Sequence, residues 1–147
     1  VFEVLAPSAD LVKQGNVKGY KHDPNNESVV GRLVFGNFSM MLTGDAEKKE
    51  EQDILAVSGA NVKSTILKSG HHGSKTSSSA DFLRAVQPEA ALISCGVNND
   101  YGHPHKETMK KYHAMKLSVY VTAENGTITV TSDGKTYNIS VERGEKQ

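Results

Sequence analysis

The sequence predicts an α/β fold, in fuller terms an α+β arrangement with a mixed sheet and helices on one face. Two observations predict it. Short runs rich in β-branched and aromatic residues alternate with helical patterns through the middle of the chain, which is typical of parallel strands. Hairpin signals lie near both ends, which adds antiparallel strands. The length of 147 residues is that of one ordinary domain.

The first third of the chain predicts a strand, a loop and a hairpin. Residues 1–5 are mostly apolar and are stopped by Pro7, so they predict a strand. Residues 14–27 carry glycines, asparagines and a proline with little apolar content, which predicts an exposed loop. Residues 28–34 and 38–42 are β-rich and are separated by a Gly-Asn turn, which predicts a hairpin.

The middle of the chain predicts two helices and two buried strands. Residues 47–57 begin with acidic residues and continue with apolar ones, which favours a helix whose start complements its dipole. Residues 64–68 and 90–94 are apolar runs that predict strands. Residues 80–86 predict a helix that Ser78 or Ser79 caps and that ends before a proline.

The last third predicts a loop, a helix and three strands. Residues 97–105 resemble a loop, and residues 106–115 place apolar side chains at helical spacing. Three strands then follow, at residues 119–122, 126–132 and 135–141. Asp133-Gly134 joins the last two and predicts a tight hairpin turn, and the tail from residue 144 to 147 is expected to fray.

Charge and composition exclude several classes of protein. Lys+Arg and Asp+Glu each total 17, so extended nucleic-acid binding and polybasic membrane anchoring are not expected. No run approaches the roughly 18 apolar residues of a transmembrane helix. Cys95 is the single cysteine, which excludes intrachain disulfides and cysteine-built zinc sites. Six histidines are then the main metal-binding resource of the chain.

Polar side chains follow three predicted strands at their carboxyl ends. Asp45 follows the second hairpin strand, His71 and His72 follow residues 64–68, and His103 follows residues 90–94. If these strands are parallel neighbours, the four side chains converge on one edge of the sheet. Carboxylate oxygen and imidazole nitrogen are common metal ligands, so the pattern predicts a metal site.

Each of these residues also has a structural interpretation. Asp45 is equally suited to cap the following helix, and the two adjacent histidines are compatible with a solvated loop. His103 before a proline is compatible with a rigid turn, and His22, His105 and His113 are expected at the surface. Cys95 after a buried strand is expected to be a small core residue and a poor nucleophile.

The serine-rich stretch from residue 74 to 79 has two interpretations as well. It is compatible with a flexible loop and helix cap, but serines at a helix start also suit a phosphate. Lys75 favours an anion there. Ser74, Lys75 and Thr76, together with His103, are therefore the candidate substrate-binding residues.

Taken together, these strings resemble a known family. The segments NESVVGRLVFGNFSMMLTGD, LKSGHHGSKTSSSADFL, QPEAALISCGVNNDYGHPH and VYVTAENGTITVTSDG, in this order, resemble the carboxyl-terminal half of metallo-β-lactamase-fold hydrolases. The resemblance is strongest to the metallo-β-lactamase-like domain of the competence protein ComEC and its stand-alone relatives. It covers residues 1 to about 134, and the HHGS and YGHP strings make it specific.

The resemblance implies a fold, a cofactor and residue roles. It implies the carboxyl-terminal half of an αββα sandwich, with residues 1–147 as a partial domain, and a site for two divalent metal ions, zinc or manganese. Asp45 resembles the carboxylate that bridges the metals, and His71 or His72 the last metal ligand. His103 resembles a histidine beside the scissile group, so Asp45, His72 and His103 are the candidate catalytic residues. Since neighbours on an extended backbone point to opposite sides, we expect only one of the two adjacent histidines to bind metal fully.

The chain departs from the family in lacking the HxHxDH string that supplies most of the metal ligands. The nearest upstream histidine, His22, has neither the spacing nor a following histidine. Catalytic zinc takes three protein ligands and a water, so this chain alone is expected to bind metal weakly and to be inactive.

Two hypotheses follow. In the first, the chain is the carboxyl-terminal portion of a metal-dependent phosphodiesterase or nuclease linked to DNA uptake, on the extracytoplasmic side of a bacterial membrane. Its partners are then a missing amino-terminal half and a phosphodiester substrate such as DNA. In the second, the chain is a truncated or degenerate module without catalysis. An apolar face left uncovered by the missing half predicts a homodimer.

Overall fold

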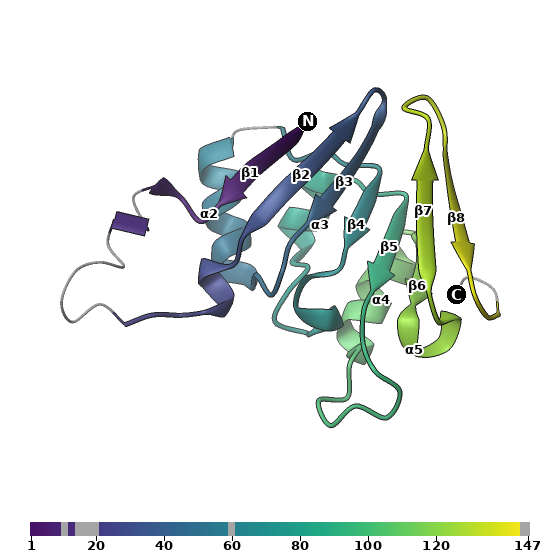
Figure 1. The fold of residues 1–147 in the computed structure, drawn as a ribbon. Coiled ribbons are helices and arrows are strands. Elements are labelled where there is room, and N and C mark those ends of the chain that lie inside the picture. Colours follow the sequence, from purple (N-terminus) through teal and green to yellow (C-terminus); the bar gives the residue numbers. More distant parts are fainter. Residues whose placement is uncertain (10–11, 14–20, 59–60, 145–147) are drawn as a thin grey trace.

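The computed structural model describes residues 1–9, 12–13, 21–58 and 61–144. Within them, a six-stranded sheet carries helices on one face and a two-stranded hairpin on the other (Figure 1). The mixed sheet and the one-sided helices confirm the predicted fold class. The assignment of this arrangement to half of a metallo-β-lactamase sandwich stays a prediction.

In the large sheet, the strands are neighbours in the order in which they occur along the chain. Its strands are β1 (Phe2–Ala6), β2 (Val30–Phe35), β3 (Phe38–Leu42), β4 (Ile66–Lys68), β5 (Ala90–Ile93) and β6 (Ser118–Val121). The pairs β1–β2 and β2–β3 are antiparallel, whereas β3, β4, β5 and β6 are parallel. The predicted hairpin turn at Gly36 is confirmed: this residue has φ +58°, and a Cβ there would lie 2.3 Å from the carbonyl oxygen of Gly134.

The helices follow the sequence prediction closely. They are α2 (Lys48–Ser58), α3 (Ala80–Val86), α4 (Lys106–Ala114), the single turn α5 (Thr122–Asn125), and the 3-10 turns η1 (Asn25–Glu27) and η2 (Gly70–Gly73). Ser79 is the cap of α3, because its hydroxyl accepts from the backbone nitrogen of Phe82 at 3.4 Å. The turn α5 occupies Thr122, which the prediction assigned to a strand.

The main core lies between the helices and the sheet. Ile54 of α2, Phe82 of α3 and Tyr112 of α4 are buried against apolar side chains of the strands, including Met41 and Leu67. Burying such a side chain contributes about 1.5–3 kcal/mol, so the helices are held chiefly by this face. The helices thereby leave the carboxyl ends of the parallel strands open for a site.

A hairpin covers part of the opposite face. Its strands, β7 (Ile128–Ser132) and β8 (Tyr137–Val141), place Ile128, Val130, Tyr137 and Ile139 over a second cluster that includes Phe38 and Ile66. The Asp133-Gly134 turn that joins them is confirmed, with Gly134 at φ +84°. The backbone nitrogen of Asn37 donates to the carbonyl of Gly134 at 2.6 Å, which ties the tip of the hairpin to the β2–β3 turn.

The sheet face beyond this hairpin is apolar and exposed at strands β1 and β2. Phe2, Val4, Leu33 and Phe35 all have exposed side chains, and the register pairs Phe2 with Leu33 on one face. Apolar side chains are therefore exposed at these two strands, whereas a missing half that covers them stays a prediction. The homodimer that such a face predicts stays a prediction.

Two predicted segments fall partly outside the described residues. The loop predicted for residues 14–27 is described only from residue 21, where its last residues form η1. Fraying is predicted for residues 144–147, and of these residues 145–147 also lie outside the described residues.

Candidate functional site

Three neighbouring parallel strands deliver the candidate residues to one edge of the sheet. Strands β3, β4 and β5 pair in parallel register, with Met40 opposite Ile66 and Ile66 opposite Ala90. Their carboxyl ends lead to Asp45, to the two adjacent histidines in η2, and to the loop that carries His103. The predicted convergence of these side chains is confirmed, since all of them line one pocket.

The pocket has a volume of about 390 Å³. Its lining residues are Asp45, His71, His72, Cys95, Gly96, Asn99, Tyr101 and His103. Among these lining residues Asp45 is the one carboxylate, and no lysine or arginine is present. The pocket is therefore rich in imidazole and poor in groups that would by themselves attract an anion.

The prediction assumed an extended backbone at the two adjacent histidines, but the structure has a turn there. His71 and His72 have φ values of 45° and 55°, so both lie in the left-handed region within a tight turn flanked by glycines. The backbone nitrogen of His71 donates to the carbonyl of Gly44 at 3.0 Å, which joins this turn to the end of β3. The assumption of an extended backbone is therefore wrong, and both side chains line the pocket. The expectation that only one of the two binds metal fully stays a prediction.

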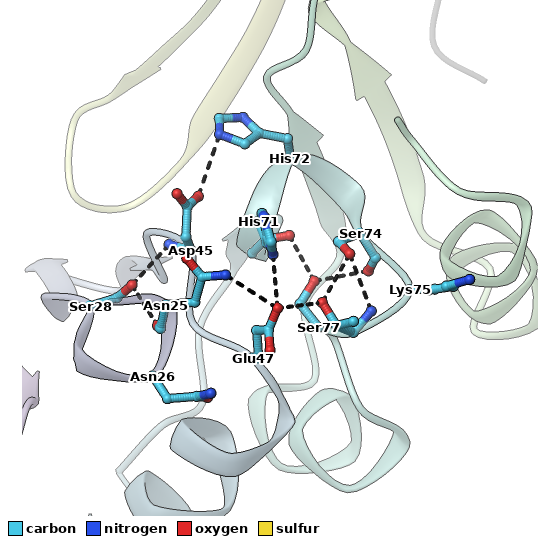
Figure 2. A network of polar contacts seen from close by, with 12 residues as sticks. Asn25, Asn26, Ser28, Asp45, Glu47, His71, His72, Ser74, Lys75 and Ser77 are labelled. Atoms are coloured by element: carbon cyan, nitrogen blue, oxygen red, sulfur yellow. Dashed lines mark hydrogen bonds and ion pairs between the residues drawn. The ribbon is translucent and has the colours of Figure 1, made fainter. Parts of the chain in front are cut away.

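His72 and Asp45 face one another across the pocket (Figure 2). The Nε2 atom of His72 lies 3.4 Å from Oδ1 of Asp45, and Nδ1 of the same ring lies 2.6 Å from the carbonyl oxygen of Ser94. Because a carbonyl only accepts, Nδ1 carries the hydrogen. The backbone nitrogen of Asp45 donates to the hydroxyl of Ser28 at 3.2 Å, which holds the backbone of Asp45 in place.

His71 is held by a different carboxylate, that of Glu47 (Figure 2). Its Nδ1 atom lies 3.2 Å from Oε1 of Glu47. The same oxygen accepts from the hydroxyl of Thr76 at 2.9 Å and from the side-chain amide of Asn25 at 3.3 Å. The acidic run predicts only a helix start for Glu47, and its position two residues after Asp45 is the signal in the sequence that it lies near the site.

His103 lies at the centre of an aromatic cluster. Its ring centroid is 5.7 Å from that of His71, 6.3 Å from that of His72 and 5.6 Å from that of Tyr101. Burial, followed by the neighbouring His105, His71 and His72, lowers the pKa of His103.

Asn99 holds the backbone of this loop. Its side chain accepts from the backbone nitrogen of His103 at 2.9 Å and donates to the carbonyl of His103 at 2.7 Å. Sequence reasoning did not single out Asn99 or Tyr101, because asparagine and tyrosine in a loop have many ordinary roles. His105, expected at the surface, is half-buried with its ring 4.8 Å from that of His103.

The candidate substrate-binding loop lies beside the pocket. Ser74 is buried and its hydroxyl lies 2.9 Å from that of Thr76, while Thr76 donates to Glu47. Lys75 is exposed, and its backbone nitrogen donates to Nδ1 of His105 at 3.0 Å. None of these three residues lines the pocket, and their predicted contact with substrate stays a prediction.

A buried polar network holds this loop in place. The carboxylate of Glu51 accepts from the backbone nitrogens of Ser78 and Ser79, at 2.5 and 2.8 Å. The hydroxyl of Tyr112 lies 2.7 Å from those of both Ser69 and Ser78. Burial raises the pKa of Tyr112 to about 12, so it stays a neutral hydrogen-bonding group. The loop is therefore fixed by helices α2 and α4.

Cys95 contacts both the core and the pocket. It packs against the main apolar cluster, as predicted, but also lines the pocket. Burial raises the pKa of its thiol, which agrees with the expectation of a poor nucleophile.

The distance between the ligand atoms of Asp45 and His72 fits a divalent cation. Two ligands bound tetrahedrally at about 2.0–2.1 Å lie about 3.3–3.4 Å apart, and the Asp45 oxygen and His72 nitrogen are 3.4 Å apart. Imidazole nitrogen and carboxylate oxygen are both common ligands of divalent cations, so a cation between Nε2 of His72 and Oδ1 of Asp45 would meet a ligand atom from each residue. Among the residues described, no group of three or more His, Cys, Asp or Glu side chains is arranged to hold a metal ion.

Within the described part of the chain, no helix combines the length and the apolar character needed to span a membrane. No protein-family model matches the chain.

Comparison with curated proteins finds relatives of competence proteins. The chain is 40% identical over 130 residues to ComE operon protein 3 of Bacillus subtilis and 37% identical over 127 residues to competence protein ComA of Neisseria gonorrhoeae; each match covers 86% of this chain. It is 42% identical over 129 residues to recombination protein 2 of Haemophilus influenzae, covering 88% of this chain. The chain spans only 15%, 17% and 15% of the lengths of these three proteins, in that order. It is therefore homologous, over most of its own length, to one short segment of proteins named for competence and recombination.

Proposed function

We propose that this chain forms part of the metal-dependent phosphodiesterase site of a longer protein that acts on DNA during uptake. The observation that carries the proposal is the pair of Asp45 and His72, whose donor atoms face each other at 3.4 Å in a pocket at the carboxyl ends of parallel strands. Two of the homologues, competence protein ComA and recombination protein 2, have names that support DNA uptake as the setting.

In this proposal the residues of the chain have distinct tasks. Asp45 and His72 hold a zinc or manganese ion, and His71, which lines the same pocket, is a further ligand. When bound, such a cation supplies an activated water and positive charge for a phosphoryl oxygen. His103, whose ring lies beside those of both adjacent histidines, is assigned to contact the scissile group. The remaining ligands, and the second metal ion, belong to another segment of the longer protein.

The balanced charge of the chain is compatible with an anionic substrate. Lys+Arg and Asp+Glu balance at 17 each, and neither lysine nor arginine is among the residues that line the pocket, so attraction for a phosphodiester is expected to come from the metal. Tyr101 at the pocket rim is 77% exposed with its ring stacked near His103, which leaves an aromatic face for a nucleobase.

The test is hydrolysis of bis(4-nitrophenyl) phosphate and of labelled single-stranded DNA, with manganese or zinc, by the longer protein that carries this segment. Asp45→Ala and His72→Ala are each expected to lower the rate more than about 100-fold, since even the outer partners of a metal are worth 10- to 100-fold. Asp53→Ala, on the exposed side of α2, is the control. Full activity in Asp45→Ala would overturn the proposal.

A further inference from the structure

Glu47 stands between the metal-binding side of the pocket and the loop beside it. It lies between β3 and α2, next to Lys48, where α2 begins, and its side chain and that of His71 are each 26% exposed. One oxygen, Oε1, receives all three of the contacts made to this carboxylate by Asn25, His71 and Thr76, at 3.3, 3.2 and 2.9 Å (Figure 2). Such convergence fixes the position of the oxygen relative to the His71 ring.

The contact decides which nitrogen of His71 carries hydrogen. A carboxylate accepts but does not donate, so Nδ1 of His71, at 3.2 Å, is the donor. In a neutral imidazole the other nitrogen, Nε2, then has a free lone pair. His72 shows the same arrangement with a different acceptor, because its Nδ1 faces the carbonyl of Ser94 at 2.6 Å. Both adjacent histidines are therefore set to bind a ligand through Nε2.

Other contacts separate this effect from a general structural one. The backbone nitrogen of Lys48 donates to the carbonyl of Thr76 at 3.0 Å, so α2 and the loop remain joined without the Glu47 side chain. Glu51 and Tyr112 hold the loop at Ser78, further along the chain. Removing the Glu47 carboxylate is thus expected to release the His71 ring while the loop stays in place.

We propose that Glu47 is a positioning residue that holds His71 as the Nδ1–H tautomer, in the ring orientation that offers Nε2 to a divalent cation in the pocket. The role of His71 as a ligand rests on the proposed function; the tautomer and its dependence on Glu47 do not. Carboxylates that orient metal-binding histidines in this way typically change metal affinity by 10- to 100-fold.

The tautomer is measured directly in the metal-free chain by long-range proton–nitrogen NMR correlation of the histidine rings. His71 is expected to be protonated on Nδ1 in the wild type and in Glu47→Gln, whose amide oxygen still accepts, and to move towards the Nε2–H form in Glu47→Ala. Asp53→Ala, also on α2, is the control and is expected to leave His71 unchanged. Circular dichroism checks that each variant is folded.

Zinc titration of the same proteins completes the test. Affinity is expected to fall about 10- to 100-fold in Glu47→Ala and much less in Glu47→Gln. A wild-type His71 that carries its hydrogen on Nε2, or a tautomer unchanged in folded Glu47→Ala, would overturn the positioning role. If the tautomer responds as expected while zinc leaves Asp45 and His72 unaffected, Glu47 does orient the ring and the proposed metal site is the part that fails.

Discussion

Oδ1 of Asp45 and Nε2 of His72 lie 3.4 Å apart, although the residues come from different strand ends. The carbonyl of Ser94 engages the opposite nitrogen of the same ring at 2.6 Å. Ser28 anchors the backbone of Asp45. The His72 ring and the backbone of Asp45 therefore each have a second contact that limits their movement relative to one another.

Gly73 links the histidine turn to the loop that carries His103. It has φ +82°, and a Cβ there would lie 2.8 Å from Cβ of Pro104 and 3.3 Å from Cγ2 of Ile93. Gly73→Ala is therefore expected to lower the free energy of unfolding by about 1–3 kcal/mol and to displace His103.

Gly96 provides the matched control, because it also lines the pocket but has nothing within 4 Å of its added Cβ. Gly96→Ala is expected to change stability by no more than about 0.5 kcal/mol. Urea unfolding of the three proteins measures the difference. Equal stabilities for the two alanine variants would contradict this account of the turn.

Glu50 makes stability depend on pH. It is 2% exposed, its Oε1 has no hydrogen-bond partner, and burial raises its pKa from 4.5 to about 7. The nearby charges of Asp53, Lys49 and Asp23 act on it as well, in opposing directions. The folded state thus binds a proton that the unfolded state releases between pH 4.5 and about 7.

The contribution of Glu50 is accordingly complete below pH 4.5 and is lost as the pH rises through about 7. At about 1.4 kcal/mol per pKa unit, the loss is at most about 3.5 kcal/mol. Glu50→Gln imitates the protonated acid, so the wild type is expected to lose stability relative to this variant between pH 5 and pH 8. A stability difference independent of pH, measured by urea unfolding, would contradict the prediction.

Tyr101 tests the substrate side of the pocket. Base–aromatic stacking is worth about 1–3 kcal/mol, so Tyr101→Ala is expected to weaken binding of labelled single-stranded DNA to the longer protein about 5- to 150-fold, and Tyr101→Phe only slightly. Fluorescence anisotropy at one fixed salt concentration measures the affinities. An oligonucleotide of abasic sites is the control and should not distinguish wild type from Tyr101→Ala. Equal affinity of both proteins for the normal oligonucleotide would refute the stacking role.

The strands and the edge of the site were predictable from the sequence, because apolar runs and glycine turns are local signals. Their parallel order followed from the intervening helices, and it correctly brought Asp45 and His103 together. The single turn α5 was missed, since four residues are too few to show helical periodicity.

The contacts of the acidic residues could not be predicted from such local sequence signals. Glu47, Glu50 and Glu51 all belong to one charged run that suits a helix start, but two of them are buried and one orients a histidine. Which side chain turns inward depends on the packing of α2 against distant loops, and this information is not local. The conformation of the adjacent histidines was mispredicted for a related reason: two consecutive residues at positive φ are held by contacts such as that of His71 with Gly44.

The most direct test of the proposed site is a zinc titration of the chain, followed by proton–nitrogen NMR with assigned histidine rings. The account predicts that zinc first perturbs His72 and the backbone of Asp45, and that Asp45→Asn and His72→Ala each weaken this response at least about 10-fold. His113→Ala, which removes an exposed histidine outside the pocket lining, should leave it unchanged. Perturbation confined to His22 and His113, or a response that survives intact in Asp45→Asn, would contradict the central claim.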